Sequence, residues 1–561
     1  MKHNYLTYLF FLLSLTLSAQ SAGPDLKWLS TIQSAADSPE DLGMQIMDVA
    51  VSPGTEIYVA GFCTAPCAFA QGVAVIPEAG GLSYFIAKYD ANGVFEWVKD
   101  LGTIGEHPMH IVAPSVDGVY LATSFSVPSV ALGNNITVNK TCTGAVCNEV
   151  LLAKFGPAGE TLWAKTYKGD SGSFFQVSGI EQAGSGKMAA LINYDTELLD
   201  LGPGFIDNTQ QETGFLLSFF DANTGTTTDV KFPGVSESSP SSQLMAYNNN
   251  GQGVMVGSFF DQITFSNGTT LTTNLPNGAN FAVGLNATGG ILWVKKISSS
   301  DYADILAADM DEEGAAYLAI DASTDLKLDD GNILSINSSY AGAVLKLQGS
   351  SFSIPVFIPY DTDDYAIMDV AIHPWGIIYT AGYTSATITY GDNQVVPDGC
   401  VDGFITETNQ DGIPISARTV GGAGCEAFAN EYYGSCLGFS LEGNLVGAGG
   451  FLFSFNEDGF SANGRGGFVT KFLTTMASTS DLYWGNVELF PNPSAGVFTL
   501  KLPEAPSSDA LISISNTQGQ EVFHQMATQQ EIGLETSLSA GMYLITVTDG
   551  KRIYRGKIQI I

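Results

Sequence analysis

The feature that most constrains the fold is a segment that recurs along most of the chain. Residues 85–102 read FIAKYDANGVFEWVKDLG, two apolar runs on either side of an Asn-Gly turn, and such a pattern predicts a β-hairpin. The segment returns every 61 to 66 residues, and its copies align on Lys88, Lys154, Ser218, Gly284, Lys346, Glu407 and Lys471. A fixed period of this size indicates a repeat architecture.

Each repeat predicts four strands. An apolar strand such as 47–51 comes first, a strand rich in small residues such as 56–62 follows, and the hairpin ends the unit. Seven sheets of this kind, set radially, make a seven-bladed β-propeller, an all-β fold that leaves only short edges. We expect the propeller to occupy residues 23–472.

The two ends of this region complement each other. Residues 26–32 (LKWLSTI) look like the second half of the hairpin, and residues 468–472 (FVTKF) look like the first half. We therefore expect the N-terminal strand to complete the last sheet and close the ring. One strand position is repeatedly tryptophan, which we interpret as packing between neighbouring blades: Trp28, Trp97, Trp163 and Trp293.

Each repeat is longer than the blades of common propellers, which run to about 40–50 residues. The surplus lies between the second and third strands, and it predicts a small extra hairpin at 130–139, 263–273, 326–337 and 388–396. Equivalent loops of a ring lie on one face, so we expect these hairpins to form a crown there.

Residues 1–19 have the pattern of a secretory signal peptide, with Lys2 before an apolar run at 6–17 and small residues for cleavage. Cleavage as late as residue 22 is an alternative. The apolar run is too short to span a bilayer, which takes about 20 residues. No other segment is long and apolar enough, so we expect no transmembrane segment in the mature chain.

The charge balance narrows the partners. Asp and Glu number 57 against 22 Lys and Arg, and the formal net charge is −35. Nucleic acid and anionic membranes are disfavoured, because binding them needs clustered basic residues. The acidity suits solubility outside the cell, and calcium binding is the alternative. Residues 309–314 resemble the start of a calcium loop but lack its bidentate Glu, so we expect a turn and predict no cofactor.

The repeat period stops after residue 472. Residues 473–485 are rich in Ser and Thr and predict a linker, and residues 486–561 contain alternating strands between Asn, Gly and Pro turns. This second pattern predicts a small Ig-like β-sandwich. It holds five basic and seven acidic residues, so the acidity belongs to the propeller.

Two resemblances bear on origin and export. Residues 26–472 resemble secreted bacterial β-propeller repeats, which implies a fold and no activity. Residues 486–561 resemble the type A sorting domain of the type IX (Por) secretion system of Bacteroidetes. The residues that carry this resemblance are Pro491, Asn492 and Pro493 after an apolar strand, Gly496 in the next turn, and Gly541 and Tyr543 at a late strand.

The second resemblance implies a route and partners. Such a chain is exported to the periplasm, passes the outer membrane through the type IX machinery, and meets a sorting protease that removes the domain. The product is then secreted or attached to the outer surface, on a Bacteroidetes cell.

Seven cysteines in an exported chain predict disulfides with one thiol left over. Cys63 and Cys67 form one close pair, and Cys142 and Cys147 form another. Cys400 and Cys425 lie in loops that should share a face, and Cys436 falls on an inner strand, where we expect a buried free thiol. The pairing of these last three cysteines stays open.

Catalytic motifs are scarce. His107 and His110 could supply metal ligands, but Pro108 and the strand context argue against a zinc site, and no nucleophile elbow or phosphate loop is present. Asp361, Asp363 and Asp364 could serve glycoside cleavage. We therefore assign no catalytic or metal residue.

The sequence favours an exported module for binding or adhesion, with an unknown extracellular glycan or protein as its ligand. The alternative is an extracellular hydrolase or lyase acting on polysaccharide or protein, with carboxylates on the face of the extra hairpins. A His, Asp or Glu cluster converging at the ring centre would favour the enzyme.

Overall fold

The computed structural model describes residues 24–36, 43–78, 81–144, 147–196, 198–202, 206–208, 213–236, 241–301, 303–328, 331, 333–336, 340–349, 351–360, 365–373, 376–428, 436–440, 443–457, 460–474, 483–502, 511–516, 521–527, 529–536, 538–549 and 552–561. These residues form β-strands, turns and loops, and none of them lies in a helix. The chain divides into two compact units, Met1–Thr474 and Thr475–Ile561. The predicted signal peptide, residues 1–19, lies outside the described residues.

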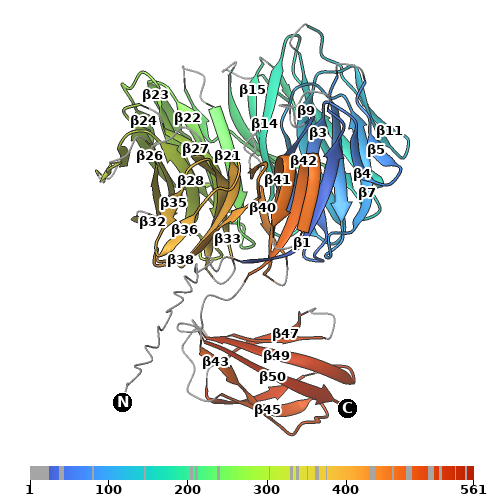
Figure 1. The fold of residues 1–561 in the computed structure, drawn as a ribbon, viewed down its shortest axis with the longest axis vertical. Coiled ribbons are helices and arrows are strands. Elements are labelled where there is room, and N and C mark those ends of the chain that lie inside the picture. The colour runs from blue at the N-terminus through green and yellow to red at the C-terminus, as the bar shows by residue number, and fades with distance from the viewer. Residues whose placement is uncertain are drawn as a thin grey trace, which may run out of the picture. The chain divides into compact units, whose positions relative to one another are not determined.

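The first unit is built from antiparallel sheets in the predicted order (Figure 1). The first sheet runs β2 (Met44–Val51), β3 (Ile57–Cys63), β6 (Ser83–Tyr89) and β7 (Phe95–Gly102). Two more follow the same plan: β8 (Met109–Ser115), β9 (Gly118–Phe125), β12 (Glu149–Phe155), β13 (Thr161–Tyr167); and β14 (Phe174–Gln182), β15 (Lys187–Asp195), β18 (Thr213–Asp221), β19 (Thr227–Lys231).

The later sheets repeat this order. They are β21 (Ser241–Tyr247), β22 (Gly253–Phe259), β25 (Ala279–Leu285), β26 (Ile291–Ser299); β27 (Ala303–Met310), β28 (Ala316–Ala322), β31 (Tyr340–Gln348), β32 (Ser351–Tyr360); and β33 (Tyr365–Ile372), β34 (Ile378–Thr384), β37 (Asp402–Thr408), β38 (Pro414–Val420). The last sheet contains β39 (Cys425–Ala427), β40 (Leu437–Phe439), β41 (Leu445–Glu457) and β42 (Phe460–Leu473), and takes β1 (Asp25–Ser34) as its next strand.

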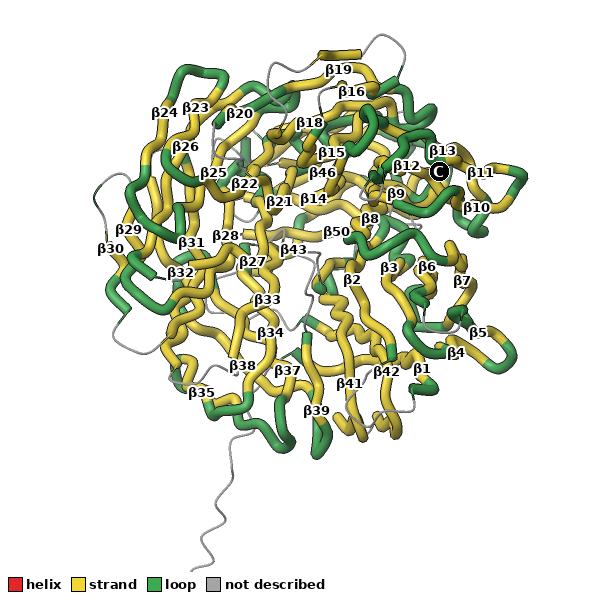
Figure 2. Tube along the Cα trace, turned by 90° about the horizontal axis from the view of Figure 1, so that it is seen from above, coloured by secondary structure: helices red, strands yellow, loops and turns green. Residues whose placement is uncertain are grey.

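The first strands of successive sheets lie side by side around a common centre (Figure 2). The neighbours are β2 and β8, β8 and β14, β14 and β21, β21 and β27, and β27 and β33, and β40 neighbours both β33 and β2. The first unit is thus all-β and propeller-like.

The strand β1 pairs with β42 as the sequence predicts. The antiparallel register runs from Asp25 opposite Leu473 to Gln33 opposite Gly466. Leu26, Trp28 and Ile32 of this strand are buried. The two incomplete copies of the hairpin, at opposite ends of the repeat region, therefore pair with each other as β1 and β42.

Tryptophan rings join neighbouring sheets, which confirms their predicted packing role. The indole N–H of Trp28 donates to the carbonyl oxygen of Ala91 (3.1 Å), and that of Trp97 donates to Pro157 (2.9 Å). Trp163 makes the equivalent bond to Ala222 (3.4 Å). Each acceptor lies in the hairpin turn of the next repeat.

Glycine is required in those turns. Gly93 has a φ of 76°, and a Cβ atom added to it would stand 2.4 Å from the Trp28 ring. Any other residue there would face both backbone strain and a clash. The turns that meet other tryptophans also hold glycines of positive φ, Gly159 against Trp97 and Gly225 against Trp163.

The extra hairpins form, but the expectation that they crown one face is wrong. They are β10 (Ser129–Gly133) with β11 (Ile136–Asn139), β23 (Gln262–Phe265) with β24 (Thr270–Thr272), β29 (Leu326–Leu328) with β30 (Ile333–Leu334), and β35 (Ile388–Tyr390) with β36 (Asn393–Val395). The same place in the first and third repeats holds β4 (Cys67–Ala70) with β5 (Val73–Val75), and β16 (Leu198–Asp200) with β17 (Ile206–Asn208).

These hairpins lie at the outer edge of the first unit (Figure 2). Two of them continue the preceding sheet, because β29 pairs with β26 and β4 pairs with β1. An outer strand presents unpaired N–H and C=O groups, and the hairpin satisfies part of that edge. In the same region, the short β20 (Gly234–Val235) pairs with β23.

Three disulfides are present in the first unit. They join Cys63 to Cys67, Cys142 to Cys147, and Cys400 to Cys425, with Cα–Cα separations of 6.2, 6.1 and 5.3 Å. The third bond decides the pairing that the sequence leaves open. Cys436 is free and buried, and burial raises the pKa of its thiol well above the usual range.

Peptide mapping of the secreted protein under non-reducing conditions is expected to find these three linked pairs. Cys436 should resist alkylation until the protein is denatured, because a buried thiol of raised pKa supplies little thiolate. A thiol at Cys400 or Cys425 that reacts in native secreted material would contradict the pairing.

The second unit packs two sheets around one core. The first sheet orders β43 (Tyr483–Asn486), β50 (Arg552–Ile560), β49 (Gly541–Asp549), β46 (Leu511–Ser515) and β47 (Glu521–Met526), and the second orders β44 (Glu488–Phe490), β45 (Val497–Lys501) and β48 (Glu531–Glu535). Phe498, Ile512, Ile545 and Ile558 are among its buried residues. Since β42 ends at Leu473 and β43 begins at Tyr483, the segment between the strands is shorter than the predicted linker, 473–485.

Candidate functional site

A cavity of about 510 Å³ lies where the first strands of the sheets meet. Its wall is made by β2, β8, β14, β21, β27, β33 and β40, and many of its residues are small or apolar, such as Ala50, Ala113, Ala307 and Ala371. Side chains of this size leave the axis open where the inner strands converge. The cavity is therefore a product of the repeat itself.

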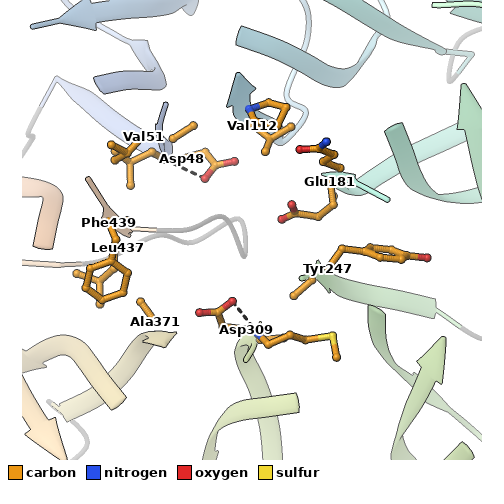
Figure 3. Close-up of a pocket in the computed structure, with 18 of the residues that line it drawn as sticks. Asp48, Val51, Val112, Glu181, Tyr247, Asp309, Ala371, Leu437 and Phe439 are labelled. Atoms are coloured by element: carbon orange, nitrogen blue, oxygen red, sulfur yellow. Dashed lines mark hydrogen bonds between the residues drawn. The ribbon is translucent and has the colours of Figure 1, made fainter. Parts of the chain in front are cut away.

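Carboxyl groups enter this cavity from different sheets. Asp48 of β2, Glu181 of β14 and Asp309 of β27 all point into it (Figure 3), and Asp369 of β33 also lines it. Asp309 begins the segment 309–314 that resembles a calcium loop, and no sequence motif marks the other three as site residues. In the sequence, each of the four is at least 60 residues from the others. Only the arrangement of the sheets brings them together.

Two of these carboxylates tie neighbouring sheets. Asp48 accepts bonds from the backbone N–H of Val49 (2.9 Å) and, across the gap, of Ile111 in β8 (2.8 Å). Asp309 accepts from Met310 (2.7 Å) and from Ile372 in β33 (2.6 Å). Bonds of this kind stabilise the ionised carboxylate and hold the inner strands in place.

Asp369 repeats the device at the next gap. It accepts from the N–H of Val370 (2.8 Å), and from Cys436 (2.7 Å) and Leu437 (2.8 Å) at the start of β40. The side chain of Asp369 is buried. Part of the acidity of the chain is thus structural, since these carboxylates replace strand-to-strand bonds that the radial arrangement does not allow.

Glu181 is different, because none of its bonds reaches another sheet among the described contacts. Asp309 and Asp48 are charged neighbours that affect its pKa, and its carboxyl group is hydrogen-bonded to the backbone of Gln182. Burial raises the pKa of Glu181 well above its usual range, and the two aspartates raise it further. This is the carboxyl group in the cavity with the most capacity for an incoming ligand.

Asp309 also has a shifted pKa. Burial raises it from 3.8 to about 7, against the effect of the two backbone N–H bonds. The cavity therefore gains negative charge as the pH rises through about 7, and a cation would bind more strongly above that value.

The two histidines weighed as metal ligands lie just before and within β8, and His110 lines the cavity. His107 and His110 are both buried, and burial lowers the pKa of each to about 4. Within the described residues, no group of three or more His, Cys, Asp or Glu could hold a metal ion. The candidates Asp361, Asp363 and Asp364 lie outside the described residues.

The segment 309–314 forms a turn, as expected. The N–H of Gly314 donates to the carbonyl of Asp311 (3.1 Å), and the Asp311 carboxylate accepts from the N–H of Glu313 (3.1 Å) and Ala315 (2.8 Å). Tyr317 and Lys346 also contact this carboxylate, at 3.1 and 3.7 Å. Its oxygens are used within the protein.

A second candidate site is the turn after β44, which contains the sorting motif. The side chain of Asn492 pairs with the last strand as a piece of backbone would. Its Nδ2 donates to the carbonyl of Lys557 (2.7 Å), and its Oδ1 accepts from the N–H of Gln559 (3.0 Å). Pro491 and Pro493 flank it, and both peptide bonds preceding them are cis.

The rest of the motif holds the same region. The carbonyl oxygen of Ser494 accepts a hydrogen bond from the N–H of Ile561 (2.9 Å), and the N–H of Ser494 donates to the carbonyl oxygen of Gln559 (2.8 Å). Gly496 has a φ of 97° and bonds through its carbonyl to Thr536. The hydroxyl of Tyr543 donates to the carbonyl of Ser539 (2.9 Å), next to Gly541. The motif therefore fixes the final strand within the sandwich.

These features define a two-part, all-β protein whose first unit is propeller-like and whose second carries a fixed terminal motif. Residues 488–561 match the family model described as a secretion system C-terminal sorting domain. The protein is therefore secreted or attached to the outer surface, and the domain connects it to the type IX secretion machinery. The described part of the chain offers no helix with the length and apolar character needed to cross a membrane.

Comparison with curated proteins finds no match. Among solved structures, the chain is similar to PorZ, a surface component of the type IX secretion system of Porphyromonas gingivalis, at 12% identity over 92% of this chain and 81% of that one, with a TM-score of 0.18. The arabinofuranosidase Arb93A of Fusarium graminearum shares 7% identity over 64% and 93% (TM-score 0.35).

BamB of Moraxella catarrhalis shares 12% identity over 62% of this chain and 96% of that one, with a TM-score of 0.23. Similarities at such low TM-scores carry no argument about what this chain binds or does.

Proposed function

We propose that the protein is an exported extracellular binding module, made of a seven-bladed β-propeller at 23–472 and an Ig-like sorting domain at 486–561. The sequence of neighbouring inner strands, in which β40 touches both β33 and β2, supports a ring that β1 completes. The signal peptide at 1–19, with cleavage there or as late as residue 22, would start the export, on a Bacteroidetes cell surface.

The observation that carries the binding role is the axial cavity. It gathers carboxyl groups from four sheets in a space of about 510 Å³ whose walls are about equally polar and apolar. A site of this composition suits a ligand that presents a positively charged group on an apolar or sugar framework. Glu181 is the residue proposed to receive that charge, since the aspartates are bonded to the backbone.

The test is a binding screen on the mature secreted protein, with an array of glycans that includes amino sugars and with peptides that contain Lys or Arg. Replacing Glu181 by Gln is expected to weaken the strongest hit by about tenfold or more, since it removes the carboxyl group that would give up its proton and pair with the bound cation. Asp117→Asn, at an exposed turn, is the matched control and should leave affinity unchanged.

The affinity should also depend on pH. Because Asp309 is neutral below its pKa of about 7 and negative above it, binding of a cationic hit should strengthen between pH 6 and pH 8. Asp309→Asn should flatten this dependence. Hits that are all neutral or anionic, and that bind E181Q as well as the parent, would contradict the axial site.

The hydrolase remains a second candidate because one observation favours it. Carboxyl groups do converge at the centre, and burial raises the pKa of Asp309 from 3.8 to about 7. A carboxyl group whose pKa lies near neutrality can act as a general acid. Release of product from a polysaccharide or protein substrate by the parent, lost in D309N, would support the enzyme.

A further inference from the structure

A junction between two sheets contains a pair of buried carboxyl groups that the binding and export roles do not use. The junction is formed by residues 398–402, which lead into β37, and residues 421–427, which include β39. Asp402 is 1% exposed and Glu426 is fully buried. Burying two carboxylates together without a cation is costly unless a proton is shared between them.

The hydrogen bonds around Asp402 and Glu426 leave one carboxyl oxygen of each residue without a donor from the described residues. Oδ2 of Asp402 accepts the N–H of Asp398 (2.7 Å), and Oε2 of Glu426 accepts the N–H of Gly422 (3.1 Å). The other oxygens, Oδ1 and Oε1, receive no donor from the described residues. The two carboxyl groups lie against the same backbone position, because a Cβ atom added to Gly421 would stand 2.5 Å from Oε2 of Glu426 and 3.1 Å from Oδ1 of Asp402, and each group affects the pKa of the other. A proton on one of them makes an O–H···O⁻ bond between the two.

We infer that Asp402 and Glu426 share one proton that locks this junction, and that the lock is lost as the medium becomes alkaline. The same junction carries the Cys400–Cys425 disulfide, a bond from the N–H of Glu426 to the carbonyl of Val401 (2.7 Å), and a bridge between Val401 and Cys425. The shared proton is therefore one of several bonds that join the β37 sheet to the β39 sheet.

The charges around the pair oppose a doubly ionised state. Asp398 adds a further negative charge beside Asp402. Arg418 of β38 donates to the carbonyl of Pro24 (2.8 Å), and Arg465 of β42 is two strands away from Cys425 in register. The residues of β2 that face the junction, Met44 to Ile46, carry no charge.

The direction of the pH effect follows from burial. Burial raises the pKa of Glu426 from 4.5 to about 8 and raises that of Asp402 as well. The native state therefore holds a proton that the unfolded chain releases near pH 4.5. Stability from this pair is fully present below that value and is lost as the pH rises toward about 8.

A substitution that replaces the shared proton with an amide hydrogen tests the inference. In E426Q, the amide carbonyl can still accept from Gly422, and its N–H can donate to Asp402. Unfolding of the full mature protein is measured in denaturant from pH 5 to pH 9. The parent should lose stability relative to E426Q by about tenfold in the folding equilibrium constant for each pH unit between pH 5 and pH 8.

Glu149 supplies the matched control. It is equally buried and lies beside the Cys142–Cys147 disulfide, but its Oε1 accepts from the N–H of Thr141 (2.6 Å), the Thr141 hydroxyl (2.8 Å) and the N–H of Cys142 (2.9 Å). E149Q should lower stability by the same amount at every pH. A role that is merely structural would give E426Q this same flat profile, and that result would overturn the inference.

A second variant, D402N, and an infrared measurement test the inference even if E426Q folds poorly. D402N leaves the bond from Asp398 in place and offers its amide N–H to Glu426, so it should also flatten the pH profile. In the parent, the infrared carbonyl band of a protonated carboxyl should fade as the pH passes about 8, and this component should be missing from D402N or E426Q. Spectra that are identical in parent and variants would exclude the shared proton.

Discussion

A chain that ends at Thr474 is expected to fold, lose its signal peptide, and accumulate in the periplasm with almost none of it outside the cell. The two units have separate cores, and residues of the sandwich core all lie beyond residue 486, so the first unit does not depend on the second for packing. The sorting domain at 488–561 is the part that the secretion machinery recognises.

Cell fractionation of a Bacteroidetes host measures this outcome, with an unrelated reporter fused to residues 475–561 as the converse experiment. The reporter should reach the surface or the medium. The cut is placed at Thr474 because β43 begins at Tyr483 and pairs with β50 of the sandwich. Truncated protein in the medium at the parental level would exclude a sorting role for the domain.

A single substitution can separate the motif from the domain. Asn492→Ala removes both side-chain bonds to β50 and leaves the carbonyl of Lys557 and the N–H of Gln559 without these partners. The expected loss is about 1–3 kcal/mol of sandwich stability together with reduced export. Gln525→Ala, on the exposed side of β47, should change neither quantity. An N492A protein exported at the parental rate would show that the two side-chain bonds from Asn492 to β50 are not needed for sorting.

The second large effect is expected from deleting residues 24–34, which removes β1. The deletion takes the buried side chains of Leu26, Trp28 and Ile32 out of the core, a loss of roughly 5 kcal/mol or more at about 1.5–3 kcal/mol each. It also exposes the edge of β42 along its paired length, and an unpaired edge invites aggregation. Thermal unfolding and light scattering report both effects.

A control variant and a rescue experiment make the deletion specific to β1. Trp28→Phe keeps a ring in place but removes the bond to Ala91, and should cost only about 1 kcal/mol. A synthetic peptide of residues 24–36, added to the truncated protein, should restore part of the lost stability by pairing with β42. A truncated protein that melts like the parent and ignores the peptide would show that β1 contributes little to the unit.

The sequence predicts the repeating part of this architecture well because its signals are local. Glycine-containing turns and alternating strands lie within 20 residues of one another in each hairpin, as do Trp97, Trp163 and Trp293 in theirs, and the structure places them as expected. The pairing of β1 with β42 could also be predicted, since each end of the repeat region lacks the half that the other supplies.

The candidate sites could not be predicted, because they depend on positions that only the radial arrangement brings together. Asp48 and Asp309 are in different repeats and at different points of their strands, so no spacing marks them as neighbours. Asp402, at the start of β37, is separated from Glu426 by the rest of that strand, by β38 and by two loops. The position of the extra hairpins was wrong for a related reason: pairing such as that of β29 with β26 satisfies an outer strand edge, which a count of loop residues does not reveal.

The pairing of β1 with β42 has a consequence for how the chain is delivered. If the proposed signal peptide directs export from the N-terminus, residues 25–34 cross the inner membrane early, and their partner at 466–473 arrives after the rest of the first unit. Until then the strand has no ladder to join, in contrast to linear repeat arrays, where each arriving repeat can dock on the one before it. A chain threaded in this direction finishes its folding with the residues that were delivered first.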